Sequence, residues 1–301
     1  MSLRIGAAPC SWGVEFPNDP NNPPWEQVLD EAKEVGYRGI ELGPIGYMPE
    51  DPTMLGDALE SRGLGLVAGV VFRPFHDPSA WDEVLDGVTR TARSLSAHGT
   101  ERLVFIDSIA PARAPFAGRA GDAPRLEGAA FSAFVERLRV AAKIGREEYG
   151  LTVSLHAHAG GYIEFEDELD AVLDAIDEDL LKVCLDSGHC AYAGFDPVAT
   201  YKRLASRIDY LHFKDVDLKI REHVVAESVG FYDACAQGVF CNLGRGSVDF
   251  EALKQAIDES GFNGWATIEQ DCDPVGVTSP VDDARINLEY LRSVDLAALP
   301  G

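Results

Sequence analysis

The stretch DYLHFKD, residues 209–215, joins a β-type apolar run to a cluster of ionisable side chains. Successive side chains of a β-strand point to opposite faces. His212 and Lys214 are therefore expected on one face, and their apolar neighbours Leu211 and Phe213 on the other. A solvated strand end would account for this stretch taken alone. Its meaning depends on whether similar stretches recur along the chain.

Similar β-type runs do recur, and each is followed by an amphipathic helical pattern. Several helical patterns close on Gly, as at Gly36 and Gly261, which is typical of a left-handed C-cap. Eight alternating units in 301 residues predict a (β/α)8 TIM barrel formed by a single domain, residues 1–301, with a doubly wound open sheet as the alternative. The expected strand and helix pairs are 4–9 with 25–36, 39–43 with 54–63, 65–72 with 81–99, 102–107 with 130–150, 152–158 with 167–176, 182–189 with 197–208, 209–215 with 250–261, and 265–271 with 281–294.

Two connections between these units, 108–127 and 216–246, are longer than the others. Long connections in a barrel of this kind are usually lids or binding loops. The six cysteines form no CxxC pair, so the sequence indicates neither a disulfide framework nor a zinc finger.

The charge balance limits the possible partners. Fifty acidic residues against 26 basic ones give a formal net charge of −24, which disfavours binding to nucleic acid or to anionic membranes. A neutral or cationic small molecule, or a metal ion, suits this balance better. The sequence shows neither a signal-peptide pattern nor an apolar run long enough to cross a bilayer, which predicts a cytoplasmic protein.

Four consecutive predicted strands end in residues that bind metals. In a (β/α)8 barrel, chemistry lies at the C-terminal ends of the strands, and consecutive strands are neighbours. Two imidazoles and two carboxylates make a ligand set suited to Mn²⁺, Co²⁺, Fe²⁺ or Zn²⁺. The sequence therefore predicts a divalent metal site formed by His156, Asp186, His212 and Glu269.

Other residues at the strand ends are candidates for supporting roles. His158 and His189 would orient the ligands or bind substrate. Lys214 would stabilise an enolate oxygen or relay a proton, with a salt bridge to Asp215 or Asp186 as the alternative. Trp12 and Glu41 are candidates for substrate binding, with a simple ion pair as the alternative for Glu41. Cys10 and Cys190 are expected to be packing residues rather than nucleophiles.

Five segments carry a family resemblance that extends over nearly the whole chain. The most specific is FYDACAQGVFCNLGRGSVDF at 231–250. The others are WEQVLDEAKEVGYRGIELGP at 25–44, LHAHAGGYIE at 155–164, CLDSGHCAYAG at 184–194 and LHFKDV at 211–216. With these segments the chain resembles the xylose-isomerase-like superfamily of metal-dependent barrels, and within it the inosose dehydratases of inositol catabolism.

The resemblance implies a metal-dependent lyase that dehydrates a cyclic polyol ketone such as 2-keto-myo-inositol. Glu269 or Lys214 would remove a proton next to the ketone, and His158 or His189 would protonate the departing β-hydroxyl. The family resemblance also predicts a homo-oligomer, either a dimer or a tetramer.

Two departures from the family pattern bear on reaction and substrate. Many superfamily members carry Glu where this chain has His156, and an enediolate epimerase generally needs a carboxylate on each face of its substrate. His156 therefore favours β-elimination over the alternative, a ketose or sugar-phosphate epimerase or isomerase, although Glu164 could supply the missing carboxylate. The segment NLGRG at 242–246 replaces a Pro-Gly pattern, so Arg245 is a candidate for binding an acidic or phosphorylated group.

Overall fold

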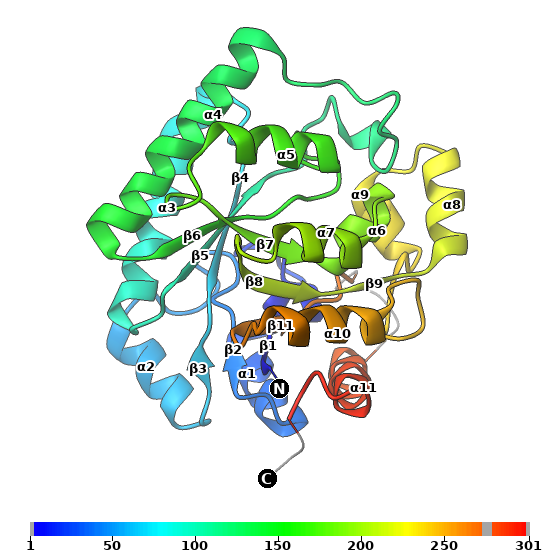
Figure 1. Cartoon of the computed structure of the whole chain (residues 1–301). Helices are drawn as coiled ribbons and strands as arrows, with labels where there is room; N and C mark the ends of the chain where they lie inside the picture. Colours follow the sequence, from blue (N-terminus) through cyan, green and yellow to red (C-terminus); the bar gives the residue numbers. More distant parts are fainter. Residues whose placement is uncertain (1–2, 273–278, 299–301) are drawn as a thin grey trace.

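In the computed structural model, which describes residues 3–272 and 279–298, a ring of strands is surrounded by helices (Figure 1). The strands follow the order β3-β2-β1-β11-β8-β7-β6-β5-β4, and neighbours in this sheet are parallel. The two ends of this order, β3 and β4, are parts of the one strand predicted over 65–72, interrupted at Val67 and Ala68. Both interrupting residues still hydrogen-bond to the β2 segment, through Ile40 and Leu42. The sheet therefore closes, as the predicted barrel requires.

The observed elements follow the predicted alternation, with bounds that differ by a few residues. The strands are β1 Arg4–Ala7, β2 Gly39–Ile40, β3 Gly65–Leu66, β4 Gly69–Arg73, β5 Arg102–Asp107, β6 Thr152–Leu155, β7 Lys182–Asp186, β8 Ile208–Phe213, β9 Asp215–Val216, β10 Phe240–Cys241 and β11 Trp265–Ile268. The helices are α1 Trp25–Val35, α2 Pro52–Glu60, α3 Trp81–Ala97, α4 Gly128–Lys143, α5 Glu166–Ala175, α6 Ser187–Ala193, α7 Pro197–Leu204, α8 Leu218–Ala226, α9 Phe231–Ala236, α10 Phe250–Ser260 and α11 Pro280–Ser293. Short helical turns are η1 Pro9–Trp12, η2 Pro78–Ala80, η3 Ala114–Phe116 and the π-helical η4 Ile144–Glu148.

Helix ends lie where the sequence places stop signals. Gly36 and Gly261 follow α1 and α10 with φ of 101° and 73°, a left-handed conformation that only glycine adopts without strain. Asp51 caps α2 by accepting a hydrogen bond from the Met54 N–H at 2.8 Å, and Pro52 occupies the first helical position.

Side-chain alternation along β8 agrees with the prediction for 209–215. Phe213 points into the layer between strands and helices, where its ring meets that of Phe250 on α10 at 5.9 Å. Tyr210 belongs instead to the small cluster inside the barrel. His212 and Lys214 continue the Tyr210 face, above that cluster, so the strand delivers both to the end of the barrel.

The connection 216–246 is structured rather than an open loop. It contains α8, α9 and the β10 strand, which pairs with β9 in a small antiparallel sheet. Figure 1 shows α8 and α9 together at one side of the barrel. An apolar cluster that includes Phe231 and Phe240 packs them onto Tyr192 of α6. The connection is therefore a wall beside the strand ends.

Asp215 holds the end of this wall in place. Its buried carboxylate accepts hydrogen bonds from the backbone N–H groups of Val216, Gly244, Gly246 and Val248. The suggested ion pair between Asp215 and Lys214 is not among the contacts of the described residues. Four backbone donors occupy the carboxylate instead.

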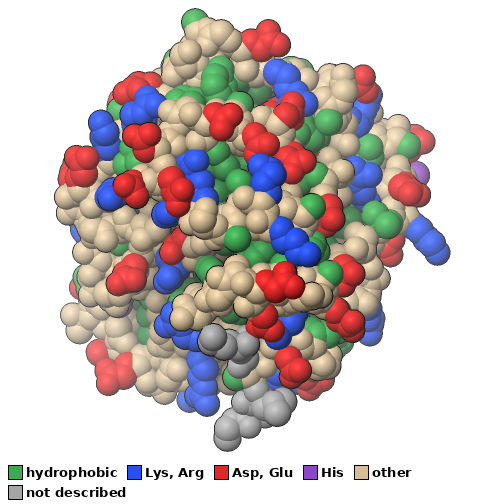
Figure 2. Space-filling view, viewed as in Figure 1, with side chains coloured by type: hydrophobic (Ala, Val, Ile, Leu, Met, Phe, Trp, Pro, Cys, Tyr) green, Lys and Arg blue, Asp and Glu red, His purple; other side chains and the backbone are tan. Residues whose placement is uncertain are grey.

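The molecular surface is consistent with the acidic composition. On the face shown in Figure 2, Lys and Arg side chains are scattered among Asp and Glu. Across residues 3–272 and 279–298, no helix combines the length and the apolar character needed to span a membrane.

Candidate active site

Four side chains from consecutive strands converge at the C-terminal end of the barrel. Strands β6, β7, β8 and β11 are neighbours in the sheet. One potential ligand atom from each of the four residues lies within 4.8 Å of all the others, and all four residues are buried. They are His156, Asp186, His212 and Glu269. The structure brings together the full set predicted from the sequence, and their binding of a metal stays a prediction.

Two ring nitrogens in this cluster suit a bound cation. His156 Nε2 lies 3.4 Å from Asp186 Oδ2, and His212 Nδ1 is buried without a hydrogen-bond partner among the described residues. His212 Nδ1 lies 3.1 Å from Glu269 Oε2 and 3.8 Å from Asp186 Oδ2. A divalent cation would give such a nitrogen a partner and balance the carboxylate charge. The donor set therefore fits Mn²⁺, Co²⁺, Fe²⁺ or Zn²⁺.

Hydrogen bonds from outside the cluster orient two of its members. Asp186 caps α6 by accepting from the backbone N–H of His189 at 2.7 Å through Oδ1, which leaves Oδ2 for the cluster. Glu41 Oε1 lies 3.0 Å from His212 Nε2 and accepts from the Tyr210 hydroxyl at 2.7 Å. With the proton on Nε2, the Nδ1 lone pair of His212 faces the cluster. Glu41 therefore supports a predicted ligand as well as lining the pocket.

Lys214 is buried beside the cluster as an ammonium ion. Its Nζ lies 2.6 Å from Asp271, 3.1 Å from Glu269 and 3.6 Å from Asp186. Burial alone would lower the pKa of Lys214, but these carboxylates raise it well above the ordinary lysine value. The Ser187 hydroxyl fixes the Lys214 backbone by donating to its carbonyl at 2.7 Å and accepting from its N–H at 3.0 Å.

The two additional histidines occupy different places. His158 lines the pocket, and its Nδ1 donates to the Ala159 carbonyl at 2.9 Å, so its Nε2 carries a lone pair. Burial and the neighbouring His156 lower the pKa of His158 to about 3, which keeps the ring neutral. His189 does not line the pocket. It accepts from the Ala159 N–H at 3.1 Å and lies 3.2 Å from Lys214 Nζ, and burial holds its pKa well below the usual value.

Two candidates for substrate binding lie away from the pocket. Trp12 is buried in η1, where its indole N–H donates to Glu31 of α1 at 2.6 Å. Arg245 is exposed in the segment after β10. Neither residue lines the pocket. The geometry therefore does not support substrate contact by Trp12 or Arg245, because loop paths rather than strand register decide where both side chains go.

Glu164 also lies outside the pocket. Its buried carboxylate accepts from the backbone N–H groups of Gly118 at 2.6 Å and Gly160 at 3.0 Å, with Arg113 Nη2 at 3.4 Å. Burial raises the pKa of Glu164 to about 7 against these donors. The carboxylate thus joins two loops, and it does not provide the second acid–base group that an epimerase would need there.

The two cysteines near the site behave as packing residues. Cys10 lines the pocket, and Cys190 is buried in α6. Burial raises the pKa of both thiols well above the ordinary value. Neither is an activated nucleophile.

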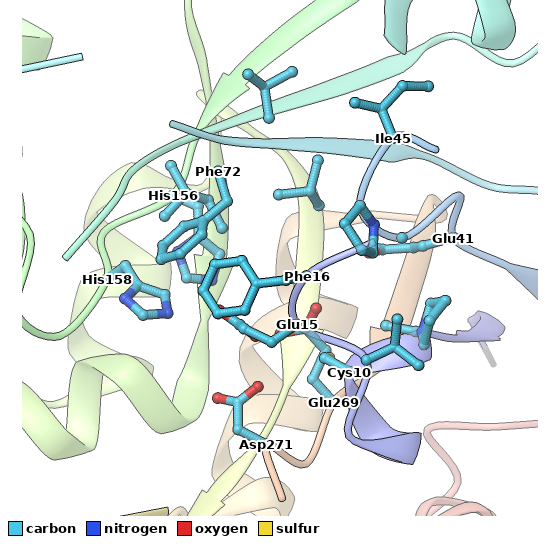
Figure 3. A pocket seen from close by; sticks show the side chains of 18 of the residues that line it. Cys10, Glu15, Phe16, Glu41, Ile45, Phe72, His156, His158, Glu269 and Asp271 are labelled. Carbon is cyan, nitrogen blue, oxygen red and sulfur yellow. The ribbon is translucent and has the colours of Figure 1, made fainter. Parts of the chain in front are cut away.

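The cluster opens into a pocket at the barrel end (Figure 3). Figure 3 shows Glu15, Phe16 and Phe72 around a space between His158 and Cys10. Sequence reasoning missed Glu15 and Phe16, which lie in the loop between η1 and α1 rather than at a strand end. Their only signal was an acidic and an aromatic residue soon after the first strand. The acidic and basic residues lining the pocket, histidines apart, are Glu15, Glu41, Arg73, Lys214, Glu269 and Asp271.

With this geometry, the chain belongs to the xylose isomerase-like TIM barrel family, whose model matches residues 29–294. This confirms the resemblance found in the sequence. The chain is 32% identical over 295 residues to the inosose dehydratase of Geobacillus kaustophilus, covering 96% of this chain and 94% of that relative. It is 29% identical over 299 residues to the rhizopine catabolism protein MocC of Rhizobium meliloti, covering 99% and 90%. The solved structure of the IolI protein with a zinc atom has a TM-score of 0.72 at 14% identity, covering 97% and 98% of the two chains.

Proposed function

We propose that this chain is a divalent-metal-dependent hydro-lyase that dehydrates a cyclic polyol ketone, with 2-keto-myo-inositol as the substrate to test first. The proposal depends on one observation, the convergence of four potential metal ligands, of which His156 and Glu269 line a pocket. Similarity to an inosose dehydratase over 96% of the chain supports the reaction class. A divalent cation held by these residues would act as a Lewis acid that polarises the ketone and acidifies the adjacent C–H bond.

The pocket favours an uncharged substrate over a sugar phosphate. Among the described residues that line it, the only Lys and Arg are Lys214 and Arg73. Lys214 is surrounded by three carboxylates, and Arg73 lies 3.3 Å from Glu83 and donates to the Phe72 carbonyl. Neither cation is left to bind a phosphate group. Neutral polyol ketones match this balance, which favours the dehydratase over the sugar-phosphate alternative.

The protonation states suggest how the chain's own residues act. Lys214 is an ammonium, so it would stabilise negative charge that develops on the substrate oxygen. The neutral His158 carries a lone pair on Nε2 that would accept the proton from the carbon next to the ketone. Because the lowered pKa of His158 makes it a weak base, this step would depend on the acidification of the C–H bond by the cation. For Lys214 the stabilising role is one of the two roles that the sequence suggested, whereas for His158 the sequence suggested an acid rather than a base.

The test is incubation of the metal-loaded protein with 2-keto-myo-inositol, following the ultraviolet absorbance of the enolised dione product. Ketohexoses are followed in parallel by NMR in D₂O. We expect the dione to form, and its formation to stop after dialysis against EDTA and return with added metal.

Two results would contradict the proposal. Full activity in protein shown by metal analysis to be metal-free would exclude the metal dependence. Deuterium entering a ketohexose without any dione from 2-keto-myo-inositol would replace the dehydratase with the epimerase.

A further inference from the structure

Glu15 is a half-buried carboxyl group that has no role in the steps above. It lines the same pocket as His158, Lys214 and Glu269, although it comes from the loop after η1 rather than from a strand end. In Figure 3 it lies among His158, Asp271 and Glu269. The Tyr232 hydroxyl of α9 donates to Glu15 Oε1 at 3.2 Å. The residue therefore bridges the α9 wall and the pocket interior.

The surroundings of Glu15 favour its neutral form. Burial raises the pKa of Glu15 to about 8, and the charge of Asp271 acts in the same direction. The Tyr232 hydrogen bond and Lys214 oppose this shift, and Glu269 adds to it. At pH 7 a carboxyl group with this pKa is mostly protonated. It holds a proton inside the pocket, whereas ordinary surface carboxyl groups are ionised.

An elimination needs such a proton, because hydroxide is a poor leaving group. The other candidates in the pocket are poorly suited to donate one. His158 is assigned the opposite role, as the acceptor of the carbon-bound proton, and Lys214 is surrounded by three carboxylates. His189, the other sequence candidate, lies outside the lining. Cys10 also lines the pocket and carries a proton, but its thiol pKa is raised well above the ordinary value, so it is a weaker acid than Glu15, whose pKa is about 8.

We propose that Glu15 is the general acid that protonates the departing β-hydroxyl, a role that rests on the proposed function. In this step, His158 takes the proton from the carbon next to the ketone, and the electrons of that C–H bond form the new C=C bond. The C–O bond breaks with its electron pair remaining on oxygen. The carboxyl proton of Glu15 joins that oxygen to give water. Glu15 is left as a carboxylate and regains a proton from solvent, and the protonated His158 releases its proton to solvent.

A change of leaving group separates proton donation from binding or folding. Fluoride departs without a proton, so an analogue carrying fluorine in place of the eliminated hydroxyl does not need the acid. We expect Glu15→Gln to slow dione formation from 2-keto-myo-inositol by about 10²–10⁴-fold, the usual contribution of general acid–base catalysis. Fluoride release from the analogue, measured with a fluoride electrode, should change little. Metal-loaded, full-length protein is used throughout.

Two further variants complete the experiment. Asp19→Asn makes the matching carboxylate-to-amide change on the same loop, where Asp19 accepts from the Asn21 N–H at 2.8 Å, and should leave both rates unchanged. Tyr232→Phe removes the hydrogen bond that orients the Glu15 carboxyl group and leaves that group in place. It should slow water loss more than fluoride loss. If Glu15→Gln does not fold, this selective effect of Tyr232→Phe still tests the role, and equal effects on both substrates would overturn it.

The outcomes distinguish this role from the proposed function. Wild-type protein that forms no dione and releases no fluoride would overturn the proposed function and the role of Glu15 with it. An active wild type with an unimpaired Glu15→Gln variant would overturn the role alone. So would a variant that loses water release and fluoride release equally, because Glu15 would then bind or position the substrate.

Discussion

At the scale of single residues, two of the predicted ligands, Asp186 and His212, are oriented by partners from outside the cluster. For His212 this partner is Glu41, which faces Nε2 and is itself fixed by the Tyr210 hydroxyl. The contact selects the tautomer that directs the Nδ1 lone pair towards Asp186 and Glu269. Such neighbours commonly set both ligand orientation and metal affinity. Glu41 is therefore a positioning residue as well as part of the pocket wall.

We expect Glu41→Gln to weaken divalent metal binding by about 10–100-fold, because the amide no longer fixes the His212 tautomer with a full negative charge. Titration of the metal-free variant with Zn²⁺ against a competing chelator measures the effect directly. Glu34→Gln is the matched control, since Glu34 makes an exposed ion pair with Arg285 at 3.0 Å. Equal affinities for the two variants would show that Glu41 does not orient a ligand.

At the scale of elements, the position of Lys214 depends on close contact between α6 and β8. A Cβ built on Gly188 of α6 would lie 2.6 Å from both Cβ and Cγ of Lys214. Only a residue without a side chain lets the two elements approach this closely. The helix begins directly at the end of β7, and this junction brings Asp186, the α6 cap, next to the lysine.

We therefore expect Gly188→Ala to push Lys214 out of place, lowering dehydration activity and destabilising the fold by roughly 1–3 kcal/mol, as overpacking usually does. Urea denaturation and the dione assay measure the two effects. Gly121→Ala provides the control, because no atom of the described residues lies within 4 Å of a Cβ built there. If the two variants were equally stable and equally active, the contact between α6 and β8 would not set the position of Lys214.

The sequence predicts the long elements better than the short ones. Regular helices such as α3 and α10 have a clear amphipathic period and recognisable ends, so their bounds agree closely with the prediction. Helices α6, α8 and α9 have six to nine residues each, which is too short for periodicity to separate them from loops. These are also the elements that form the wall around the site.

At the scale of the whole molecule, barrel closure explains which site residues could be predicted. Consecutive parallel strands are neighbours, so residues at their ends converge whatever the loops do. For that reason, the set His156, Asp186, His212 and Glu269 could be predicted from the sequence. Trp12, Glu164 and Arg245 lie on loops or turns, whose paths depend on tertiary packing. For the same reason, Glu15 could not be predicted from the sequence, although it lines the pocket.

The apolar core and the charge of Lys214 predict how the molecule responds to removal of the metal. The fold rests on a large apolar core, and Lys214 already balances part of the carboxylate charge at the site. Metal-free protein should therefore keep its circular dichroism spectrum while losing activity. A cation that binds only the folded state at 100 times its Kd adds about 2.7 kcal/mol of stability. Tm should then rise by a few degrees on adding Zn²⁺ or Mn²⁺.

The source of that rise can be located with one pair of variants. His212→Ala removes a predicted ligand and should abolish the Tm increase on adding metal. His223→Ala removes an exposed imidazole on α8 and should keep it. The comparison uses the metal-induced difference for each protein, so a lower starting Tm in His212→Ala does not affect it. A full increase in His212→Ala would mean that the stabilising cation binds elsewhere, because this cluster cannot keep its affinity after losing one of its two imidazole ligands.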